Sequence, residues 1–345
     1  MQSARFGSDP DIARTRGAPS KTRVGLVLGA GGVVGQAYHA GVLAALHREL
    51  GWDPRSASVI VGSSAGSVTG TLLRLGVAAS DLAAIATGSP LSVESASLVQ
   101  RILPDASDVP APPPGAWLRP WRPPSRALLA RTARRPWAFR PEVAAMTMLP
   151  PGRIDLTDRA APLHELVGDE WPGDLWICTS RRSDGARVVF GRDGSPPAPL
   201  AAAVLASCAI PGYFAPVTIG AVQYFDGGVH SSTNADALRT VGPDVVVVVA
   251  PMSAASVPLG SPDTLLRWAA RRRLDRESAR LERMGSTVVR IEPAGDSMKA
   301  MGLQPMNNAR SRSVSMAAYR ETVRLIAEGA IPESLADRVE AVSTG

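Results

Sequence analysis

The sequence contains little cysteine and little histidine, which limits the kinds of site that it can build. Among its 345 residues are two cysteines, Cys178 and Cys208, and four histidines. Both cysteines lie in apolar surroundings, and the histidines are scattered along the chain. Neither a disulfide framework nor a zinc cluster is therefore indicated. We expect a reduced protein that needs no metal ion and no other cofactor.

An apolar stretch of the kind that crosses a membrane is also missing. The uncharged segment 194–225 is long enough to span a bilayer. Proline and glycine interrupt it, however, at Pro196, Pro197, Pro199, Pro211, Gly212, Pro216 and Gly220. The first 22 residues lack the apolar core that a signal peptide carries. We therefore expect no signal peptide, no transmembrane helix and a cytoplasmic location.

Aromatic residues are few, at 5%, whereas arginine is abundant and the formal net charge is +6. This balance favours contact with an anionic surface, either membrane headgroups or nucleic acid. No nucleic-acid partner is expected, because no aromatic module for base stacking accompanies the charge. The longest run of arginines falls on a predicted surface helix at residues 265–284 and is typical of a solvated face. It comprises Arg267, Arg271, Arg272, Arg273, Arg276, Arg280 and Arg283.

Strand and helix patterns alternate along the chain. Apolar runs at residues 23–28 and 58–61 are each followed by a glycine-rich turn and then by helical periodicity, at 36–50 and 65–75. Five consecutive valines within residues 244–251 predict a central strand that is covered on both faces. This order is typical of an α/β fold with a largely parallel central sheet.

One main domain is predicted at residues 23–330, between a flexible basic tail at 1–22 and a C-terminal tail at 331–345. Within it, residues 85–160 are rich in proline, arginine and tryptophan and are expected to form an inserted cap or lid. Aromatic residues interleaved with arginine suit peripheral contact with a membrane. They equally suit a cap that packs on the main domain, so the sequence leaves both open, along with the oligomeric state.

The stretch Gly62-Ser63-Ser64-Ala65-Gly66 has the form G-x-S-x-G between a strand and a helix. Such a sharp turn exposes a serine hydroxyl at the end of a sheet, and its glycines permit the cramped backbone. Ser64 is the serine with the required spacing. The motif and its context leave open whether Ser64 is a nucleophile or part of an ordinary turn.

A second glycine cluster, which contains Gly29, Gly31, Gly32 and Gly35, follows the first predicted strand. Backbone N–H groups at the start of a helix are well placed to bind a phosphate or a developing oxyanion. A dinucleotide site would need G-x-G-x-x-G, but its third glycine position holds Val34. Four glycines in seven residues exceed what a tight turn alone requires.

The third motif, Asp226-Gly227-Gly228, directly follows a short strand. Alone it is a common turn, but beside a nucleophilic serine its carboxylate becomes a candidate base. A hydrolase triad would add a histidine after the aspartate. His230 follows too closely for that role. The alternatives are that Asp226 acts directly on Ser64, or that the chain is not a triad enzyme.

Together, and in this order, the three motifs resemble those of the patatin-like phospholipase family. The resemblance is carried by "VGLVLGAGGVVGQAYHAGVLAAL", "IVGSSAGSVTGTLL" and "LAAAVLASCAIPGYFAPVTIGAVQYFDGGVHSSTNADAL". It covers about residues 23–75 and 172–250. It implies a three-layer α/β/α fold and an acyl hydrolase that works through a serine–aspartate dyad.

Carried onto this sequence, the resemblance implies Ser64 as nucleophile and Asp226 as base. The backbone N–H groups of Gly31, Gly32 and Val33 would form the oxyanion hole. The reaction would pass through an acyl-enzyme that water, activated by the aspartate, releases. The implied substrates are lipid esters, of the kind that a phospholipase A or a lysophospholipase cleaves.

One departure from the family bears on the substrate. The family's glycine loop commonly carries arginine or lysine before its last glycine, where this sequence has Val34. The missing charge either weakens the placement of a phosphate-bearing lipid or marks a subgroup that cleaves another acyl ester. Two other functions stay open: a catalytically silent relative that binds lipid or protein, and a nucleotide-binding protein that uses the glycine loop.

Overall fold

The computed structural model describes residues 22–102, 120–256, 262–332 and 335. In these residues an eight-stranded sheet has the order β5-β6-β3-β2-β1-β7-β8, with β4 also paired to β3. The strands are β1 (Val24–Leu28), β2 (Val59–Ser63), β3 (Leu175–Arg181), β4 (Arg187–Phe190), β5 (Val217–Ile219), β6 (Val222–Asp226), β7 (Val245–Val249) and β8 (Thr287–Ile291).

The centre of the sheet is parallel and one edge is antiparallel. Strands β3, β2, β1, β7 and β8 run parallel to their neighbours in that order, whereas β4 and β6 pair antiparallel with β3. All five valines of β7 are buried. A strand that is covered on both faces needs no polar alternation, which explains this sequence.

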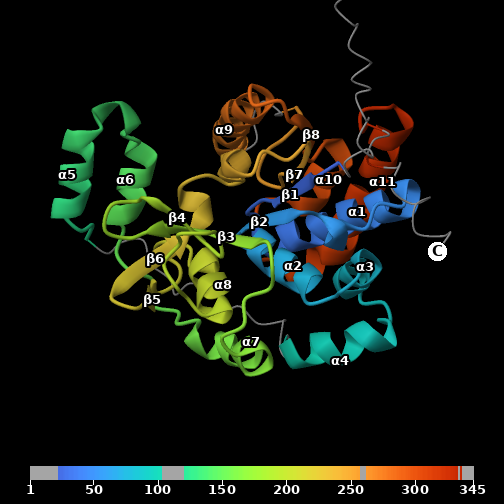
Figure 1. Cartoon of the computed structure of the whole chain (residues 1–345), viewed down its shortest axis with the longest axis horizontal. Coiled ribbons are helices and arrows are strands. Elements are labelled where there is room, and N and C mark those ends of the chain that lie inside the picture. The colour runs from blue at the N-terminus through green and yellow to red at the C-terminus, as the bar shows by residue number, and fades with distance from the viewer. Residues whose placement is uncertain (1–21, 103–119, 257–261, 333–334, 336–345) are drawn as a thin grey trace, which may run out of the picture.

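Helices cover both faces of the sheet (Figure 1). Alternate strand residues point to opposite faces, so Leu26 packs among α1, α2 and α11, whereas Val27 packs with α9 through Leu274 and Leu281. The α-helices are α1 (Gly32–Leu50), α2 (Ala65–Arg74), α3 (Ala79–Thr87), α4 (Val93–Ile102), α5 (Arg126–Arg134), α6 (Pro141–Met148), α7 (Ala161–Val167), α8 (Leu200–Cys208), α9 (Thr264–Glu282), α10 (Gly295–Met301) and α11 (Ser311–Ala327). The expected α/β fold with a largely parallel sheet is confirmed.

The helix after the glycine loop begins earlier than the periodicity predicts. Its first residue is Gly32 rather than residue 36, so the loop proper is three residues long. The Gly35 amide already donates to the Gly31 carbonyl at 3.0 Å, and the Val34 amide donates to the carbonyl of Pro305 at 3.1 Å. A contact with a distant segment thus helps to fix the first helical turn, and periodicity alone does not reveal it.

The insertion predicted at residues 85–160 is described as two separated parts. Helix α4 lies beside α7, whereas α5 and α6 project from the β4 side of the molecule (Figure 1). Residues 103–119 lie outside the described part of the chain, as do most residues of both predicted tails. The domain boundaries, and a lid function for the insertion, stay predictions.

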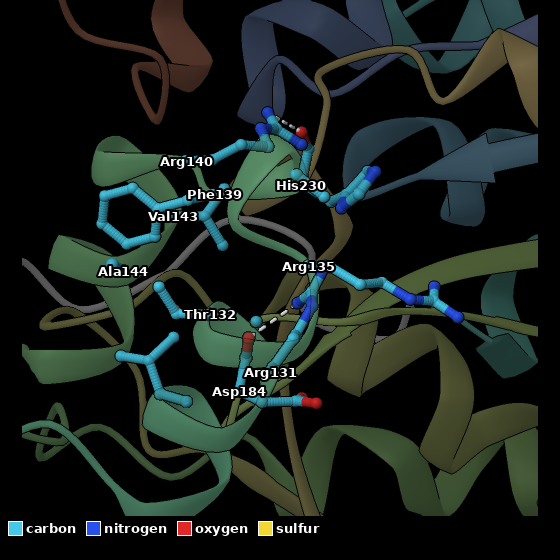
Figure 2. A pocket seen from close by; sticks show the side chains of 12 residues that line it. Arg131, Thr132, Arg135, Phe139, Arg140, Val143, Ala144, Asp184 and His230 are labelled. Atoms are coloured by element: carbon cyan, nitrogen blue, oxygen red, sulfur yellow. Dashed lines mark hydrogen bonds between the residues drawn. The ribbon is translucent and has the colours of Figure 1, made fainter.

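Helices α5 and α6 are tied to the main body by arginines. Arg131 donates to the carbonyl of Asp184 at 2.7 Å, and Arg140 donates to the carbonyl of His230 at 2.5 Å. Figure 2 shows both contacts around a cavity of about 20 Å³ between these helices and the main domain. In the described residues, no helix is long and apolar enough to cross a membrane.

Candidate active site

Ser64 occupies a sharp turn between β2 and α2 at the carboxyl edge of the sheet. Its φ of 52° lies in the left-handed region, which is uncommon for a residue with a side chain. Its amide donates to the Ser207 hydroxyl at 2.9 Å, and that hydroxyl donates to the carbonyl of Cys178 at 2.7 Å. The turn is therefore held by the neighbouring strand β3 and by α8.

The two glycines that flank this turn are required by close backbone approach. A β-carbon at position 66 would lie 1.9 Å from the carbonyl oxygen of Leu28. One at position 62 would lie 2.6 Å from the carbonyl oxygen of Gly66. Glycine at 62 and 66 therefore lets α2 start directly against β1 and β2.

The structure brings Asp226 to Ser64 although 162 positions separate them, because β6 pairs with β3 so that Asp226 lies opposite Thr179. Burial raises the pKa of Asp226 from its ordinary value near 3.8 to about 6. Hydrogen bonds from the Ser64 hydroxyl and from the Gly228 amide, the latter at 2.7 Å, act in the opposite direction. The carboxylate is therefore desolvated and in hydrogen-bonding contact with the serine.

Both glycines of the third motif have steric or bonding roles. A β-carbon at Gly227 would lie 2.2 Å from the Cys178 carbonyl oxygen, so this position also needs glycine. Gly228 supplies the amide that bonds to Asp226. The turn is thus built to hold the carboxylate against strand β3.

Cys208 is a further neighbour of the Ser64 hydroxyl, a place that its apolar sequence surroundings do not indicate. Its thiol is in hydrogen-bonding contact with the Ser64 side chain, and burial raises the pKa of Cys208 to about 12. Ser67 also contacts this thiol, at 3.8 Å between oxygen and sulfur. Cys208 is therefore a neutral thiol beside the serine hydroxyl.

The glycine loop presents backbone amides beside Ser64. Among the described residues, the amides of Gly31, Gly32 and Val33 have no hydrogen-bond acceptor. The two preceding amides, of Gly29 and Ala30, donate to the carbonyls of Val249 and Ser232. Gly32 has a φ of 63°, and a β-carbon there would lie 2.6 Å from the carbonyl oxygen of Pro305. Gly32, Val33 and Ser64 line one cavity. The start of α1 thus offers donors to an anion at this site.

That cavity has a volume of about 260 Å³ and lies between α1, α2, α3 and α8. Its wall is largely apolar, and representative lining residues are Ala37, Val68, Leu72, Leu82, Ile85 and Leu205. Arg159 of the short 3-10 helix Thr157–Ala160 is the one charged residue among those that line it. No residue of α5 or α6 appears among the lining residues. The geometry suits an apolar chain that ends at Ser64.

A buried polar network supports the Asp226 turn, and its central residue is Asn234. Short-range sequence patterns do not reveal this network. The Asn234 side-chain amide donates to the Ser63 hydroxyl at 2.9 Å, to the Ser231 carbonyl at 2.7 Å and to the Gly227 carbonyl at 3.2 Å. Asn234 therefore links the residue before Ser64 to the residue after Asp226. Its φ of 54° shows that the network holds it in an uncommon conformation.

Glu277 of α9 binds the same segment through its buried carboxylate. Its carboxylate accepts from the Thr233 hydroxyl at 2.6 Å and from the Ala235 amide at 2.9 Å. Burial raises the pKa of Glu277 above its ordinary value. The sequence did contain a sign that Glu277 is buried. It lies three residues after Leu274 and four before Leu281, which places it on the buried face of α9.

The two histidines nearest the motifs are uncharged at neutral pH. Burial lowers the pKa of His39 to about 3, and its Nδ1 lies 3.3 Å from the Thr69 hydroxyl. His230 likewise has its pKa lowered to about 3, mainly by burial and further by the nearby arginines Arg187 and Arg140. Neither pKa suits a base that ionises near neutral pH.

The comparisons with known proteins identify the family. The model of the patatin-like phospholipase family matches residues 26–239, which include both turns and the Asp226 motif. The chain therefore belongs to the patatin-like phospholipase family. This membership supports lipid hydrolysis as its general activity. No curated protein matches the chain.

Among solved structures, the chain is similar to VipD from Legionella pneumophila, with 14% identity and a TM-score of 0.42. That match covers 90% of this chain and 67% of VipD. It is also similar to the type III effector protein ExoU, with 16% identity and a TM-score of 0.39. Here the match covers 91% of this chain and 54% of ExoU, so the chain spans about half the length of that protein.

Proposed function

We propose that the protein is a serine acyl hydrolase that cleaves a carboxylic ester of a lipid through Ser64 and Asp226. The observation that carries the proposal is the hydrogen-bonding contact between the Ser64 hydroxyl and the buried Asp226 carboxylate. A pKa near 6 leaves this carboxylate ionised at neutral pH yet basic enough to accept a proton. The apolar cavity that ends at Ser64 suits an acyl chain.

In the proposed reaction the Ser64 oxygen attacks the ester carbonyl carbon while its proton passes to Asp226. The amides of Gly31, Gly32 and Val33 stabilise the negative charge that develops on the carbonyl oxygen. The C–O bond to the alcohol then breaks, and the alcohol takes the proton from Asp226. A water molecule then attacks the acyl carbon while Asp226 takes its proton. The bond from this carbon to the Ser64 oxygen breaks, Asp226 returns the proton to that oxygen, and the fatty acid leaves.

The size and lining of the cavity also indicate which substrate fits. Its volume of about 260 Å³ lies below the roughly 300–1,000 Å³ of most ligand pockets, which favours one acyl chain over two. We infer that Arg159 supplies the positive charge that Val34 does not, and contacts an anionic headgroup. Arg159→Gln would then raise KM for phosphatidylglycerol but leave KM for a neutral p-nitrophenyl ester unchanged. Arg159→Lys, which keeps the positive charge, should raise KM for phosphatidylglycerol much less.

Peripheral contact with a membrane through α5 and α6 is part of the proposal. In this region Trp137 and Phe139 are exposed among several arginines. Aromatic and basic side chains together are favoured at a lipid–water interface. Replacing both aromatics with serine should weaken turnover of vesicle lipids more than turnover of a soluble ester.

The test of the activity is fatty-acid release from lysophosphatidylcholine and phosphatidylglycerol in mixed micelles, together with a soluble p-nitrophenyl ester. Wild type should turn over at least one of these, and both Ser64→Ala and Asp226→Asn should lose about a thousandfold or more in rate. Ser313→Ala, which removes an exposed serine on α11, is the matched control. Full activity in Ser64→Ala would refute the proposal.

A further inference from the structure

Large apolar side chains are exposed at the beginning of helix α9. Leu265, Leu266 and Trp268, here called the α9 tip, are 67%, 66% and 51% exposed. The residue between them, Arg267, is buried and donates to the carbonyls of Pro251 at 3.1 Å and of Ser253 at 2.9 Å. The helix start is therefore anchored, and the exposure of its tip does not come from fraying. Single exposed apolar residues are common, but a group of three on one turn points to a contact surface.

The α9 tip lies at the same edge of the sheet as the candidate active site. Pro251 lies two residues after Val249, the carboxyl end of β7, and a β-carbon at Gly31 would lie 2.9 Å from its ring. Arg267 thus joins the tip to the residue that packs on the glycine loop. The other end of α9 precedes β8 and lies at the opposite edge of the sheet.

Other exposed apolar residues lie at this edge. Met252 follows Pro251 in the chain. Leu303 belongs to the segment whose Pro305 carbonyl accepts from the first turn of α1. The α9 tip, Met252 and Leu303 thus place exposed apolar side chains near the glycine loop from three separate segments.

The outward face of α9 beyond the tip is basic. Arg272 stacks on the ring of Trp268 at 4.6 Å from its centroid, and Arg276 is exposed one turn further along the same face. The acid between them, Asp275, is paired with Arg290 at 2.6 Å. An apolar tip with arginines behind it can insert its side chains between acyl chains while the guanidinium groups meet anionic headgroups.

We propose that the α9 tip, with Arg272 and Arg276, docks the protein onto an anionic lipid bilayer with the glycine-loop edge of the sheet toward the lipid. Charge decides between a bilayer and a second copy of the chain, because a two-fold contact through this face would bring the same arginines together. The docking does not depend on catalysis, and it presents the candidate active site to the surface that holds lipid esters.

The test measures binding of the full-length chain to vesicles in a Ser64→Ala background, so that hydrolysis does not alter the lipid. Vesicles are made of equal parts phosphatidylglycerol and phosphatidylcholine, or of phosphatidylcholine alone. Replacing Leu265, Leu266 and Trp268 with serine should lower partitioning onto the mixed vesicles about tenfold or more. The control is Met284→Ser, which removes a residue that is 50% exposed at the other end of α9 and should change nothing.

A charge variant, Arg272→Glu with Arg276→Glu, should bind both kinds of vesicle equally. Added salt, which weakens binding of the parent to the mixed vesicles, should not weaken binding of this variant. Equal binding by the tip variant and the Met284→Ser control would overturn the proposal, as would equal binding of the Ser64→Ala parent to both kinds of vesicle. Sedimentation velocity without lipid identifies the alternative: a dimer that the tip variant dissociates, with vesicle binding unchanged, would make this face a subunit contact.

Folding and catalysis are checked separately. The tip substitutions, made in the chain that retains Ser64, should leave the thermal midpoint and the hydrolysis of a soluble ester unchanged. If the tip substitutions lower the thermal midpoint, the charge variant decides the test, because it alters exposed side chains only. It must still lose the preference for the mixed vesicles. Docking without any ester hydrolysis by wild type would contradict the proposed function and leave the docking inference standing.

Discussion

Two neighbouring strand-to-helix turns at the carboxyl edge of the sheet are built alike but use glycine differently. In the β1–α1 turn the residue with left-handed backbone is itself a glycine, Gly32, with a φ of 63°. In the β2–α2 turn it is Ser64, with a φ of 52°, between glycines at positions 62 and 66. The first turn offers amides, and the second offers a hydroxyl on a strained residue.

The difference shows where the sequence tolerates strain. Glycine occupies each position where a β-carbon would meet backbone, whereas a side chain is kept at the position that faces Asp226. A polar residue held in a sparsely populated conformation is a feature of functional sites. The segment after Asp226 joins both turns, since Ala30 donates to the Ser232 carbonyl at 2.7 Å and Asn234 donates to Ser63.

The largest expected effect on stability comes from Gly66→Ala. Its β-carbon would overlap the Leu28 carbonyl, and we expect a loss of about 3 kcal/mol or more in the free energy of unfolding. Gly35→Ala is the contrast, because position 35 lies within helix α1 and a β-carbon there would have its nearest neighbours at 3.6 Å. This substitution should be neutral or stabilising by up to about 1 kcal/mol. Urea unfolding of the two variants measures both, and similar losses would show that close approach does not explain Gly66.

Asp226 should make stability and activity depend on pH in opposite directions. Its pKa is raised on folding, so the carboxyl is neutral in both states below pH 3.8 and the folded state loses stability as pH rises toward 6. At pH 8, Asp226→Asn should be more stable than wild type by about 3 kcal/mol, a difference that vanishes near pH 3.5. Thermal or urea unfolding across this range measures it, and a constant difference would contradict the raised pKa.

The activity of wild type should follow the ionised form of Asp226. We expect kcat/KM for a soluble ester to rise with pH through an acidic limb centred near 6. A limb centred near 4 would mean that burial does not shift this carboxyl, and the absence of any acidic limb would argue against Asp226 as the base.

Asn234 should couple the two turns. Asn234→Gly keeps the left-handed backbone accessible but removes the three hydrogen bonds that the side-chain nitrogen donates and the one that its oxygen accepts from Arg187. It should cost about 2 kcal/mol of stability. We expect kcat for ester hydrolysis to fall more than KM changes, since the residues beside Ser64 and Asp226 lose their link. A double-mutant cycle with Ser63→Ala tests the link, and full additivity of the two losses would refute it.

The smallest effect concerns the strain at Ser64. Ser64→Gly relieves a φ that Ser64→Ala retains, so the glycine variant should be the more stable of the two by about 1 kcal/mol. The entropy that glycine adds to the unfolded chain reduces this difference. Chemical unfolding of the two inactive variants compares them, and a more stable alanine variant would show that the turn is unstrained.

Much of this fold could be predicted from local patterns, because the parallel strands and their helices are consecutive in the chain. The valine run of β7 and the strand-to-helix order around Gly62 and Gly66 were sufficient for the α/β class. The start of α1 at Gly32 was missed, since it depends on the distant Pro305 carbonyl. Periodicity cannot register such a contact.

The candidate site was only partly predictable. The motifs pointed to Ser64 and Asp226, but their proximity follows from the antiparallel pairing of β6 with β3, which short-range patterns do not reveal. Asn234 occupies the N-cap position of the 3-10 helix Ala235–Thr240, but its side chain makes no cap bond and turns back to Ser63, which short-range patterns do not reveal. Glu277 was hidden in an arginine-rich helix that the composition assigned to solvent.

The most direct test of the account is labelling with a fluorophosphonate, followed by intact-mass measurement and peptide mapping. In wild type, with detergent present, the account predicts a single adduct on Ser64 whose formation slows below pH 6. The adduct should be absent in Ser64→Ala and should form far more slowly in Asp226→Asn. No adduct on folded wild type, or an adduct on another serine, would contradict an activated nucleophile at Ser64.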